Sequence, residues 1–553
     1  GFQTPEWAKG AVMYQIFTDR FCNGDKSNDV LNDEYSYIGE HVCQVDDWNR
    51  YPAQMDVRNF YGGDLKGVWD KLDYLQDLGV EVIYFNPLFV SPSNHKYDIQ
   101  DYDYVDPHFG VIVSDEGKLL SEGDQCNTHA SRYMDRVTNK KNLEASNEFF
   151  AKLVEEIHKR GMKVIIDGVF NHCGSFNKWL DREHIYSTSP EQYASGAYES
   201  FNSPYHTFFK FYSNQWPDNN SYDGWWGNDT LPKLNYEEAD TLEQYILGIG
   251  KKWVSEPYCV DGWRLDVADE LPDSFIQKLN AAARREKSDA LIIGEVWEDA
   301  SNKIAYSERR RYFQGGELDS VMNYPLRDAI LGFLNGGTAE HFAESMECIR
   351  ENYPRDVFYN LMNVVGTHDT ARALTLLGVT ENEWKLDRNG RAHYQLPPDR
   401  LEIALRRRRL AAVIQFTMPG SPTIYYGDEA GQQGFEDPFN RRTYPWGHEN
   451  QELLAFYRRL CEIRAEEQAL ADGDLQFSDT TAGALLRYER TSGDSRLVIV
   501  VNRGHQYVET KIDALYALDL LSGEGFAYAD PDGLIVSVPP ETAYILRCVN
   551  AAD

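Results

Sequence analysis

The sequence predicts an α/β protein: a closed (β/α)8 barrel, or TIM barrel, with an insertion after the third strand and a C-terminal antiparallel β-sandwich. Eight short apolar runs alternate with stretches of helical periodicity. These runs lack the polar and apolar alternation of half-exposed strands, which favours parallel strands buried on both faces. After residue 467 the pattern changes to short alternating segments, which is typical of an antiparallel domain.

The eight predicted strands lie at residues 12–17, 80–86, 163–169, 261–267, 291–296, 318–324, 362–367 and 421–427. An amphipathic helix precedes the second strand, beginning at the candidate N-cap Asp64 and ending at Gly79. The same unit recurs before the third strand, where the helix ends at Gly161. Eight such units favour a closed barrel over an open sheet, and no glycine-rich nucleotide-binding turn argues otherwise.

Two connections are longer than ordinary barrel loops: residues 91–141 after the second strand and 171–236 after the third. We therefore predict four segments. Residues 1–170 form the first part of the barrel, 171–236 an inserted domain, 237–467 the second part of the barrel, and 468–553 the C-terminal β-domain. Long loops at the carboxyl ends of barrel strands usually shape the active site.

Composition excludes several classes of partner. The 553 residues carry a net charge of -33, so a basic surface for nucleic acid or an anionic membrane is not expected. No run of 18 apolar residues predicts a membrane span, and a soluble protein is expected, cytoplasmic or secreted; the chain does not begin with Met. Eight cysteines without a CxxC motif predict free thiols, with a Cys22–Cys43 disulfide as the alternative.

Acidic residues stand at the ends of three predicted strands, where catalytic residues of such barrels lie. Asp266 ends the fourth strand, Glu295 the fifth and Asp369 the seventh. The sequence therefore predicts three carboxylates at one mouth of the barrel.

Carboxylates in a water-poor cleft are costly unless they are paired or used in chemistry. Cleavage of a glycosidic bond uses two of them, about 5 Å apart when the configuration is retained. Arg264, two residues before Asp266, points to the same face of its strand and would keep a nucleophile ionised. A single Asp or His at a strand end is more often structural. The prediction therefore depends on several such residues occurring together, in order, at successive strand ends.

Six motifs occur in order: DGVFNH (167–172), LPKLN (231–235), GWRLDVADE (262–270), GEVW (294–297), GTHD (366–369) and GSPTIYYGDE (420–429). With these motifs the chain resembles the α-amylase family of glycoside hydrolases, family 13. It is most similar to the cyclomaltodextrinase, neopullulanase and maltogenic amylase group. The resemblance implies that residues 171–236 are the family's domain B and the C-terminal unit its domain C.

The resemblance also implies roles for individual residues. Asp266 would be the nucleophile, Glu295 the general acid/base, and Asp369 the residue that binds the 2-OH and 3-OH of the sugar. The implied substrate-binding residues are His95, Tyr97, His172, Arg264 and His368, with Tyr97 stacking on the cleaved sugar. Two more substrate-binding residues are predicted from their positions: Trp297, two residues after Glu295, would border the acceptor, and Arg372 lies at the end of the seventh strand. Tyr222 and Trp226 of the insertion would be either sugar platforms or packing residues.

The implied function is a retaining α-glucan hydrolase acting on α-1,4 bonds in maltodextrins, cyclodextrins or starch. One alternative is a pullulanase or amylopullulanase type that cleaves α-1,6 bonds; another is a catalytically inactive carbohydrate-binding relative. The usual Asn of GWRLDVANE is Asp269 here, which leaves the bond preference open. Almost nothing precedes PEWAKGAVMYQIFTDRF, where the group usually carries a β-domain, so monomer and dimer both stay open.

A loop near the start carries hard oxygen ligands that suit Ca²⁺. Asn23, Asp25, Asn28 and Asp29 lie in FCNGDKSND, and Asp64 lies in YGGDL. The resemblance implies a structural calcium site at these positions, with the backbone carbonyl of Gly62 as a further ligand. The alternative is that the acidic residues are turn and helix-cap residues.

Overall fold

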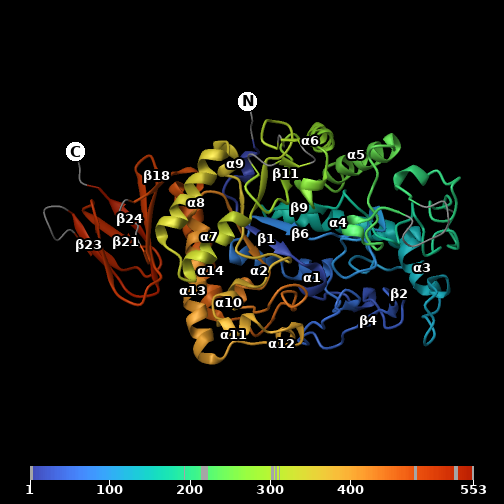
Figure 1. The fold of residues 1–553 in the computed structure, drawn as a ribbon, viewed down its shortest axis with the longest axis horizontal. Helices are drawn as coiled ribbons and strands as arrows, with labels where there is room; N and C mark the ends of the chain where they lie inside the picture. The colour runs from blue at the N-terminus through green and yellow to red at the C-terminus, as the bar shows by residue number, and fades with distance from the viewer. Residues whose placement is uncertain are drawn as a thin grey trace.

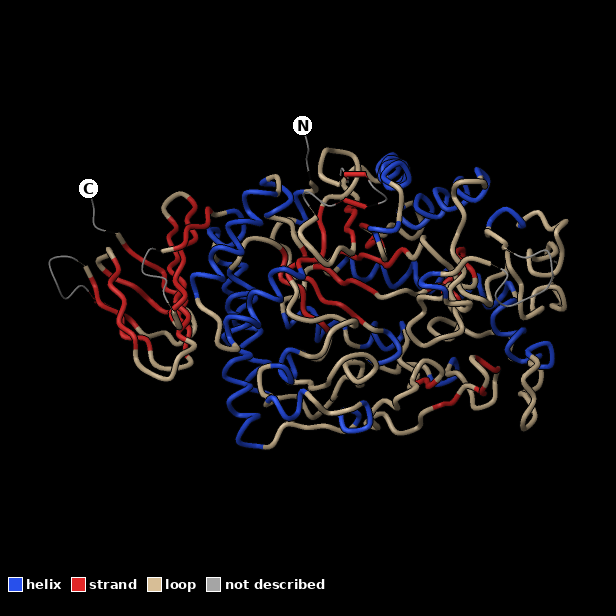
Figure 2. The backbone as a smooth tube through the Cα atoms, in the orientation of Figure 1, coloured by secondary structure: helices blue, strands red, loops and turns tan. Residues whose placement is uncertain are grey.

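A computed structural model describes residues 4–191, 193–212, 222–300, 304–305, 308–309, 312–478, 483–527 and 533–550. Figure 1 shows a helix-covered barrel in the middle of the molecule, the C-terminal strands as a separate unit at one end, and the long inserted segments at the other. The inserted end consists mostly of loops (Figure 2). Within the described residues, no helix is long and apolar enough to cross a membrane.

All eight predicted barrel strands are present. They are β1 (Met13–Ile16), β6 (Val82–Phe85), β9 (Lys163–Gly168), β10 (Gly262–Leu265), β11 (Leu291–Gly294), β14 (Ser320–Asn323), β15 (Met362–Asn363) and β16 (Ser421–Tyr425). They close into a barrel in the order β1-β16-β15-β14-β11-β10-β9-β6. Alternate residues, among them Met13, Tyr84, Ile165 and Ile293, form one buried cluster that fills the barrel.

The helices are α1 (Leu65–Asp70), α2 (Leu72–Leu78), α3 (Ser131–Thr138), α4 (Lys140–Lys159), α5 (Asp240–Val254), α6 (Asp273–Glu286), α7 (Tyr324–Leu334), α8 (Ala339–Asn352), α9 (Arg355–Phe358), α10 (Ala373–Leu376), α11 (Glu381–Trp384), α12 (Arg388–Ala392), α13 (Pro398–Thr417), α14 (Gln451–Glu466) and α15 (Gln468–Asp472). The helix predicted from Asp64 to Gly79 is divided at Lys71 into α1 and α2. Asp64 is its N-cap, accepting a 2.7 Å hydrogen bond from the Gly67 amide.

Three connections at the carboxyl end of the barrel pack into one wall. The loop after β1 contains β2 (Ser36–Tyr37), β3 (Glu40–His41), β4 (Cys43–Gln44) and β5 (Asn59–Phe60), and the next connection contains β7 (Phe89–Val90), β8 (Asp101–Val105) and α3. Tyr35, Tyr133, Phe176 and Ile185 come from these two connections and the insertion, yet they share one buried cluster. Residues 213–221 of the predicted insertion lie outside the described residues.

The insertion leaves and returns at the end of β9, because His172 pairs with Lys233 in an antiparallel bridge. The short β12 (Ile304–Ala305) and β13 (Glu308–Arg309) form a hairpin in the connection after β11.

The C-terminal unit is the predicted β-sandwich. One sheet has the order β17-β18-β19-β24-β21-β22 and a second sheet contains β20 and β23. The strands are β17 (Asp474–Phe477), β18 (Leu485–Ser492), β19 (Ser495–Asn502), β20 (Val508–Ile512), β21 (Tyr516–Asp519), β22 (Gly525–Ala527), β23 (Leu534–Val538) and β24 (Thr542–Val549). Val498, Val536 and Leu546 pack between the sheets. All eight cysteines are free thiols, so the Cys22–Cys43 disulfide does not form.

Candidate active site

Strand register brings Arg264 and Asp167 together at the mouth of the barrel. The two residues are partners in the pairing of β10 with β9, so their side chains project on the same face. Arg264 Nη1 donates to both carboxylate oxygens of Asp167, at 3.0 and 3.1 Å. Both side chains are fully buried, so this pair fixes the guanidinium group before any substrate binds.

The same guanidinium group contacts two of the three predicted catalytic carboxylates. Arg264 Nη1 lies 3.0 Å from Asp266 Oδ1, and Arg264 Nη2 lies 2.7 Å from Glu295 Oε2. Asp266 and Glu295 are each only 7% exposed. The structure therefore places the two carboxyl groups on either side of one fixed cation.

Backbone strain next to Asp266 aims an amide at Glu295. Val267 has φ 46°, a left-handed conformation that a β-branched residue rarely adopts. In this conformation its N–H donates to Glu295 Oε1 at 3.0 Å. Such strain costs about 1–3 kcal/mol and persists where the surrounding structure enforces it, commonly at functional sites.

Burial and the charge of Glu295 raise the pKa of Asp266 well above its usual value, although Arg264 opposes the shift. The charges of Asp167 and Asp369 act in the same direction as Glu295. The raised pKa means that Asp266 holds a proton up to a higher pH than an exposed aspartate does.

Asp369 joins the site from the loop after β15. His368 Nε2 lies 3.2 Å from Asp369 Oδ2, and Arg441 Nη2 lies 3.8 Å from Asp369 Oδ1. The Asp369 side chain is 33% exposed and opens to the mouth. Partial burial and the charge of Glu295 raise its pKa to about 7.

His368 is held as a neutral hydrogen-bond donor. Burial, then the charges of Arg264 and Arg441, hold its pKa well below the usual range. Gln15 Nε2 lies 2.8 Å from His368 Nδ1. Because an amide nitrogen only donates, Nδ1 is the acceptor, and the ring proton is on Nε2, which faces Asp369.

Tyr97 lies parallel to His368, with ring centroids 5.2 Å apart and planes 10° apart. Its hydroxyl donates to Asp167 Oδ2 at 2.7 Å, as does the hydroxyl of Tyr84. His95 Nδ1 accepts a 3.0 Å hydrogen bond from the Tyr97 backbone amide. This arrangement fixes the ring of Tyr97 at the base of the mouth.

His172 also lies beside Asp266. Its Nε2 lies 3.9 Å from Asp266 Oδ2, and its ring stacks on Trp225 at 5.3 Å between centroids. Burial lowers the pKa of His172 to about 3, so the ring is neutral. The structure thus gathers five of the seven predicted substrate-binding residues around the carboxylates: His95, Tyr97, His172, Arg264 and His368.

Trp297 borders the site as an exposed platform. It is 45% exposed and stacks face to face on Tyr324, with centroids 3.8 Å and planes 9° apart. Trp226 is 83% exposed, whereas Tyr222 is 5% exposed and accepts a 2.8 Å hydrogen bond from Arg182 Nη1. Tyr222 is therefore a packing residue of the insertion, and Trp226 is free to meet a ligand.

Arg372 does not reach the carboxylates. Its Nη1 donates to the Tyr426 carbonyl at 2.6 Å and to Asp428 Oδ1 at 2.9 Å, and its guanidinium carbon lies 3.9 Å from the Tyr425 ring centroid. The prediction that Arg372 binds substrate is therefore wrong. Its position at a predicted strand end did not indicate that the loop turns the side chain into the protein interior. The arginine beside Asp369 is Arg441, which lies in none of the six motifs.

The predicted calcium residues divide into two sets. Asn23 Nδ2 donates to both oxygens of Asp29, at 3.0 and 3.2 Å. Gly62 has φ 91°, and a Cβ there would lie 2.5 Å from Asn23 Nδ2 and 2.7 Å from Asp29 Oδ1, so the close approach requires glycine. Asn23 Oδ1 and Asn28 Oδ1 are buried and have no hydrogen-bond partner within the described residues.

The other two acids are engaged by backbone amides. Asp64 accepts from Gly24 and Asp25 at 2.9 and 3.0 Å in addition to its helix-cap bond, and Asp25 accepts from Ser27 at 3.0 Å. Burial raises the pKa of Asp29 to about 6 and that of Asp64 to about 7. The donor set fits a hard cation, because two amide oxygens and a desolvated carboxylate are left without a positive partner.

The chain is similar to several known proteins. The model of the alpha amylase catalytic domain matches residues 15–142 and 144–451. An amylopullulanase of Thermoanaerobacter thermohydrosulfuricus is 35% identical over 96% of this chain and 36% of its own length. A cyclomaltodextrinase of Geobacillus thermopakistaniensis is 33% identical over 100% of this chain and 79% of its own. The chain thus spans about a third of the length of that amylopullulanase.

Among solved structures, the type III pullulan hydrolase from Thermococcus kodakarensis has a TM-score of 0.77 at 30% identity, over 99% of this chain and 83% of that one. A cyclic α-maltosyl-(1→6)-maltose hydrolase from Arthrobacter globiformis, in complex with maltose, has a TM-score of 0.73 at 25% identity, over 98% and 100% of the chains.

Proposed function

The chain belongs to the alpha-amylase family of glycoside hydrolases, and from that premise we propose that it is a retaining hydrolase of α-1,4-glucosidic bonds in maltodextrins, cyclodextrins or starch. One observation carries the proposal: Arg264 hydrogen-bonds both Asp266 and Glu295 at the barrel mouth. Two carboxyl groups bridged by one guanidinium suit the short separation of about 5 Å in retaining enzymes, rather than the ~6.5–9.5 Å of inverting ones.

In the proposed first step, a carboxylate oxygen of Asp266 attacks the anomeric carbon of the sugar. The bond from that carbon to the glycosidic oxygen breaks, and Glu295 donates its proton to the departing oxygen. The product is a covalent β-glucosyl ester on Asp266 and a free reducing or shortened chain. Arg264 stabilises the ionised form of Asp266 before the attack.

In the second step, Glu295 accepts a proton from water, whose oxygen attacks the anomeric carbon and releases Asp266. Two inversions leave the product in the α configuration. A sugar hydroxyl in place of water gives transglycosylation by the same atom movements, and the exposed face of Trp297 would hold that acceptor.

Three neutral or anionic groups would hold the sugar that is cleaved. Asp369 would accept hydrogen bonds from its 2-OH and 3-OH, and His368 Nε2–H and His172 Nε2 lie beside the two carboxylates. The ring of Tyr97 would support the apolar face of the sugar. Hydrogen bonds to the 2-OH that strengthen in the transition state contribute several kcal/mol in this class of reaction.

A second candidate, cleavage of α-1,6 bonds, has support from the relatives. Two of the similar proteins are an amylopullulanase and a type III pullulan hydrolase. The products released from pullulan would distinguish cleavage of α-1,4 bonds from cleavage of α-1,6 bonds. Panose as the sole product indicates α-1,4 cleavage, maltotriose indicates α-1,6 cleavage, and a mixture indicates both.

The shared wall of the three connections favours short or cyclic substrates. Tyr35, Tyr133 and Phe176 pack the wall as one rigid unit beside the mouth. Bulky branches next to the cleaved bond would meet this wall, so we expect kcat/KM for maltodextrins or cyclodextrins to exceed that for raw starch. Equal efficiency per accessible bond on amylopectin would contradict this substrate preference.

We further propose a structural Ca²⁺ held by Asn23, Asp25, Asn28, Asp29, Asp64 and the Gly62 carbonyl. The unpartnered amide oxygens of Asn23 and Asn28 support the oxygen-rich site. When bound, the ion would supply positive charge that joins the loop after β1 to the start of α1. It would take no part in bond cleavage, because none of these residues belongs to the strand ends that carry the carboxylates.

Release of reducing sugar from maltoheptaose tests the proposed activity against an inactive carbohydrate-binding relative. Proton NMR before mutarotation tests the stereochemistry. We expect the α-anomer as the first product, whereas an initial β-anomer would require an inverting site. Binding of maltoheptaose without any turnover would leave only the carbohydrate-binding alternative.

A further inference from the structure

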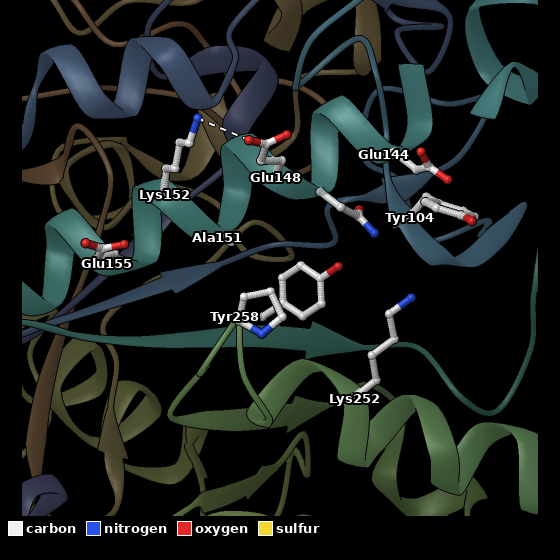
Figure 3. Close-up of a pocket in the computed structure, with 10 residues that line it drawn as sticks. Tyr104, Glu144, Glu148, Ala151, Lys152, Glu155, Lys252 and Tyr258 are labelled. Carbon is white, nitrogen blue, oxygen red and sulfur yellow. Dashed lines mark ion pairs between the residues drawn. The ribbon is translucent and has the colours of Figure 1, made fainter. Parts of the chain in front are cut away.

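A groove on the outer wall of the barrel is separate from the catalytic mouth. It has a volume of about 520 Å³ and runs between α4, the end of α5 and the β8 strand. Figure 3 shows α4 along one side with Glu144, Glu148, Lys152 and Glu155, and Tyr258 and Lys252 on the other. These helices precede β9 and β10, so the groove lies on the helix layer and includes none of the strand-end residues of the active site.

Two tyrosine rings face this groove, and both are held in place. Tyr258 packs on the buried Trp253, with ring centroids 4.5 Å apart. Lys252 Nζ lies 5.3 Å from the ring centroid of Tyr104. Both tyrosines are half-buried and line the groove with the part that reaches solvent. Rigid aromatic faces that remain open to solvent lose little conformational entropy when a ligand binds.

Hydrogen bonds also hold the residues that form the floor of the groove. Asn147 Oδ1 accepts from the Val105 amide at 2.8 Å, and Asn147 Nδ2 donates to the Asp103 carbonyl at 2.9 Å. Lys252 Nζ donates to the same carbonyl at 2.8 Å. The floor is therefore preformed by α4, α5 and β8 together, which is the usual state of a small-molecule site.

Both lysines that line the groove are already paired, so an anionic ligand is not the best fit. Lys152 lies 3.3 Å from Glu148, and Lys252 lies 3.3 Å from Asp103. A phosphate group would thus find no unpaired ammonium group here. A metal ion fits no better, since the described residues that line this groove include no group of three His, Cys, Asp or Glu side chains arranged to hold one.

We propose that this groove is a second binding site for a neutral oligosaccharide, a segment of the same α-glucan chain that the catalytic mouth cleaves. Sugar rings present apolar C–H faces, which suit Tyr104 and Tyr258, and a rim of hydroxyls, which suit Glu144 and Glu148. The volume lies within the ~300–1,000 Å³ of small-molecule pockets. The choice of ligand rests on the proposed function, whereas the existence of the site does not.

A site on the outer wall would act only on long chains. A polymer can occupy the groove and the mouth of one molecule at once, which raises its effective concentration at the mouth. Maltotriose is too short to gain from a second site on another face of the barrel. The groove therefore changes affinity for polysaccharides and leaves the cleavage of short substrates unaltered.

The test measures binding without cleavage. In a Glu295→Gln background, retardation by soluble amylopectin in native gels gives an apparent Kd. The double substitution Tyr104→Ala and Tyr258→Ala should weaken binding about tenfold, as expected for loss of aromatic anchors. Tyr507→Ala is the matched control, because Tyr507 is 69% exposed on the C-terminal domain. Unchanged retardation of the double variant would overturn the proposal.

A second variant guards against misfolding of the first. Glu148, with a side chain 70% exposed on α4, can be replaced by Arg to obstruct the groove without touching the core. Glu148→Arg should also weaken amylopectin binding at an unchanged melting temperature. If either variant instead changes the oligomeric state in sedimentation experiments, the groove is a subunit contact and the proposal is wrong.

Rates on maltotriose in the active background separate this proposal from the proposed function. Loss of maltotriose cleavage in the tyrosine variants would place the groove in the catalytic site and overturn the proposal. Absence of cleavage by the unsubstituted protein would contradict the proposed function alone, because the amylopectin gels would still report the groove.

Discussion

Arg264 and Asp167 form a fully buried ion pair, with Nη1 of the arginine 3.0 Å from Oδ1 of the aspartate. The pair lies below Asp266 and Glu295, which share the same guanidinium group. Asp167 is therefore a positioning residue: it fixes the cation that in turn fixes the two carboxylates. It also contributes negative charge to the site, which affects their titration.

Asp167→Asn should lower kcat by roughly 10- to 100-fold, because a displaced Arg264 misplaces the reacting carboxylates. It should also move the acid limb of kcat/KM. Burial and neighbouring charges raise the pKa of Asp266, so the attacking carboxylate is lost as the pH falls through that raised value. Removing the Asp167 charge lowers this pKa, and the acid limb should shift to lower pH.

The control for Asp167→Asn is Asp98→Asn, which also removes a buried carboxylate that accepts a tyrosine hydroxyl, here Tyr37 at 2.5 Å. The control should lose stability without a shift of the acid limb. An acid limb that moves equally in both variants would assign the effect to general loosening of the fold.

Asp266→Asn should reduce turnover of maltoheptaose by ~10⁴-fold or more, since the covalent step is lost. The melting temperature should stay close to that of the unsubstituted protein, because an asparagine keeps the shape and still accepts from Arg264. Asp356→Asn, in the first turn of α9, is the control and should keep the full rate. A variant of Asp266 that keeps a tenth of the rate would remove the nucleophile assignment.

His108 should make stability fall with rising pH. The ring of His108 lies 2.6 Å from Glu34 and 2.7 Å from Asp106. Burial alone would lower the pKa of His108, but the two negative charges outweigh burial and raise this pKa to about 9. Protonated His108 therefore contributes fully to the free energy of unfolding below pH ~6.5, the pKa of histidine in the unfolded chain. This contribution is lost as the pH rises through about 9, the pKa in the folded protein. The full contribution is about 3 kcal/mol.

Melting temperatures between pH 6 and pH 9.5 check this prediction. His108→Gln should flatten the decline, because the glutamine does not titrate. The control His129→Gln removes an exposed histidine that pairs with Asp124 and should keep the slope of the unsubstituted protein. Identical slopes for all three proteins would show that another group controls the alkaline loss.

Removal of calcium should lower stability more than activity. A ligand that binds only the folded state at a hundredfold excess over Kd stabilises it by about 2.7 kcal/mol. EGTA should thus lower the melting temperature by a few degrees and leave initial rates at low temperature nearly unchanged.

Substitutions then identify the ligands. Asp29→Ala and Asp25→Ala should both abolish the response of the melting temperature to added Ca²⁺, and the exposed Asp46→Ala should keep it. If neither EGTA nor added Ca²⁺ changes the melting temperature, these residues serve only as turn and cap residues.

Trp297→Ala should lower the ratio of transglycosylation to hydrolysis about fivefold, the equivalent of roughly 1 kcal/mol of aromatic contact with the acceptor sugar. The reason is that Trp297 presents one face to solvent while Tyr324 supports the other. Trp384→Ala is the control, since Trp384 is 46% exposed on α11. Equal product ratios in the two variants would exclude Trp297 from the acceptor site.

The sequence by itself determined the barrel and the place of its carboxylates. Continuous apolar runs predict parallel strands that are buried on both faces, because neither face of such a strand can be exposed to water without cost. Asp266 and Glu295 directly follow such runs, so they had to meet at the carboxyl end of the barrel, and Asp369 lies in the loop that follows β15. The helix predicted from Asp64 to Gly79 and the sandwich were also readable, since their periodicities are local.

Only the tertiary structure decided which distant groups surround those carboxylates. Arg441 lies beside Asp369, and Gln15 fixes the proton of His368, although no local pattern links them. Arg372 turned out to pair with the buried Asp428. The reason is physical: periodicity specifies which face of a strand or helix is buried, but the partner of a polar side chain depends on loops whose course is set by long-range packing.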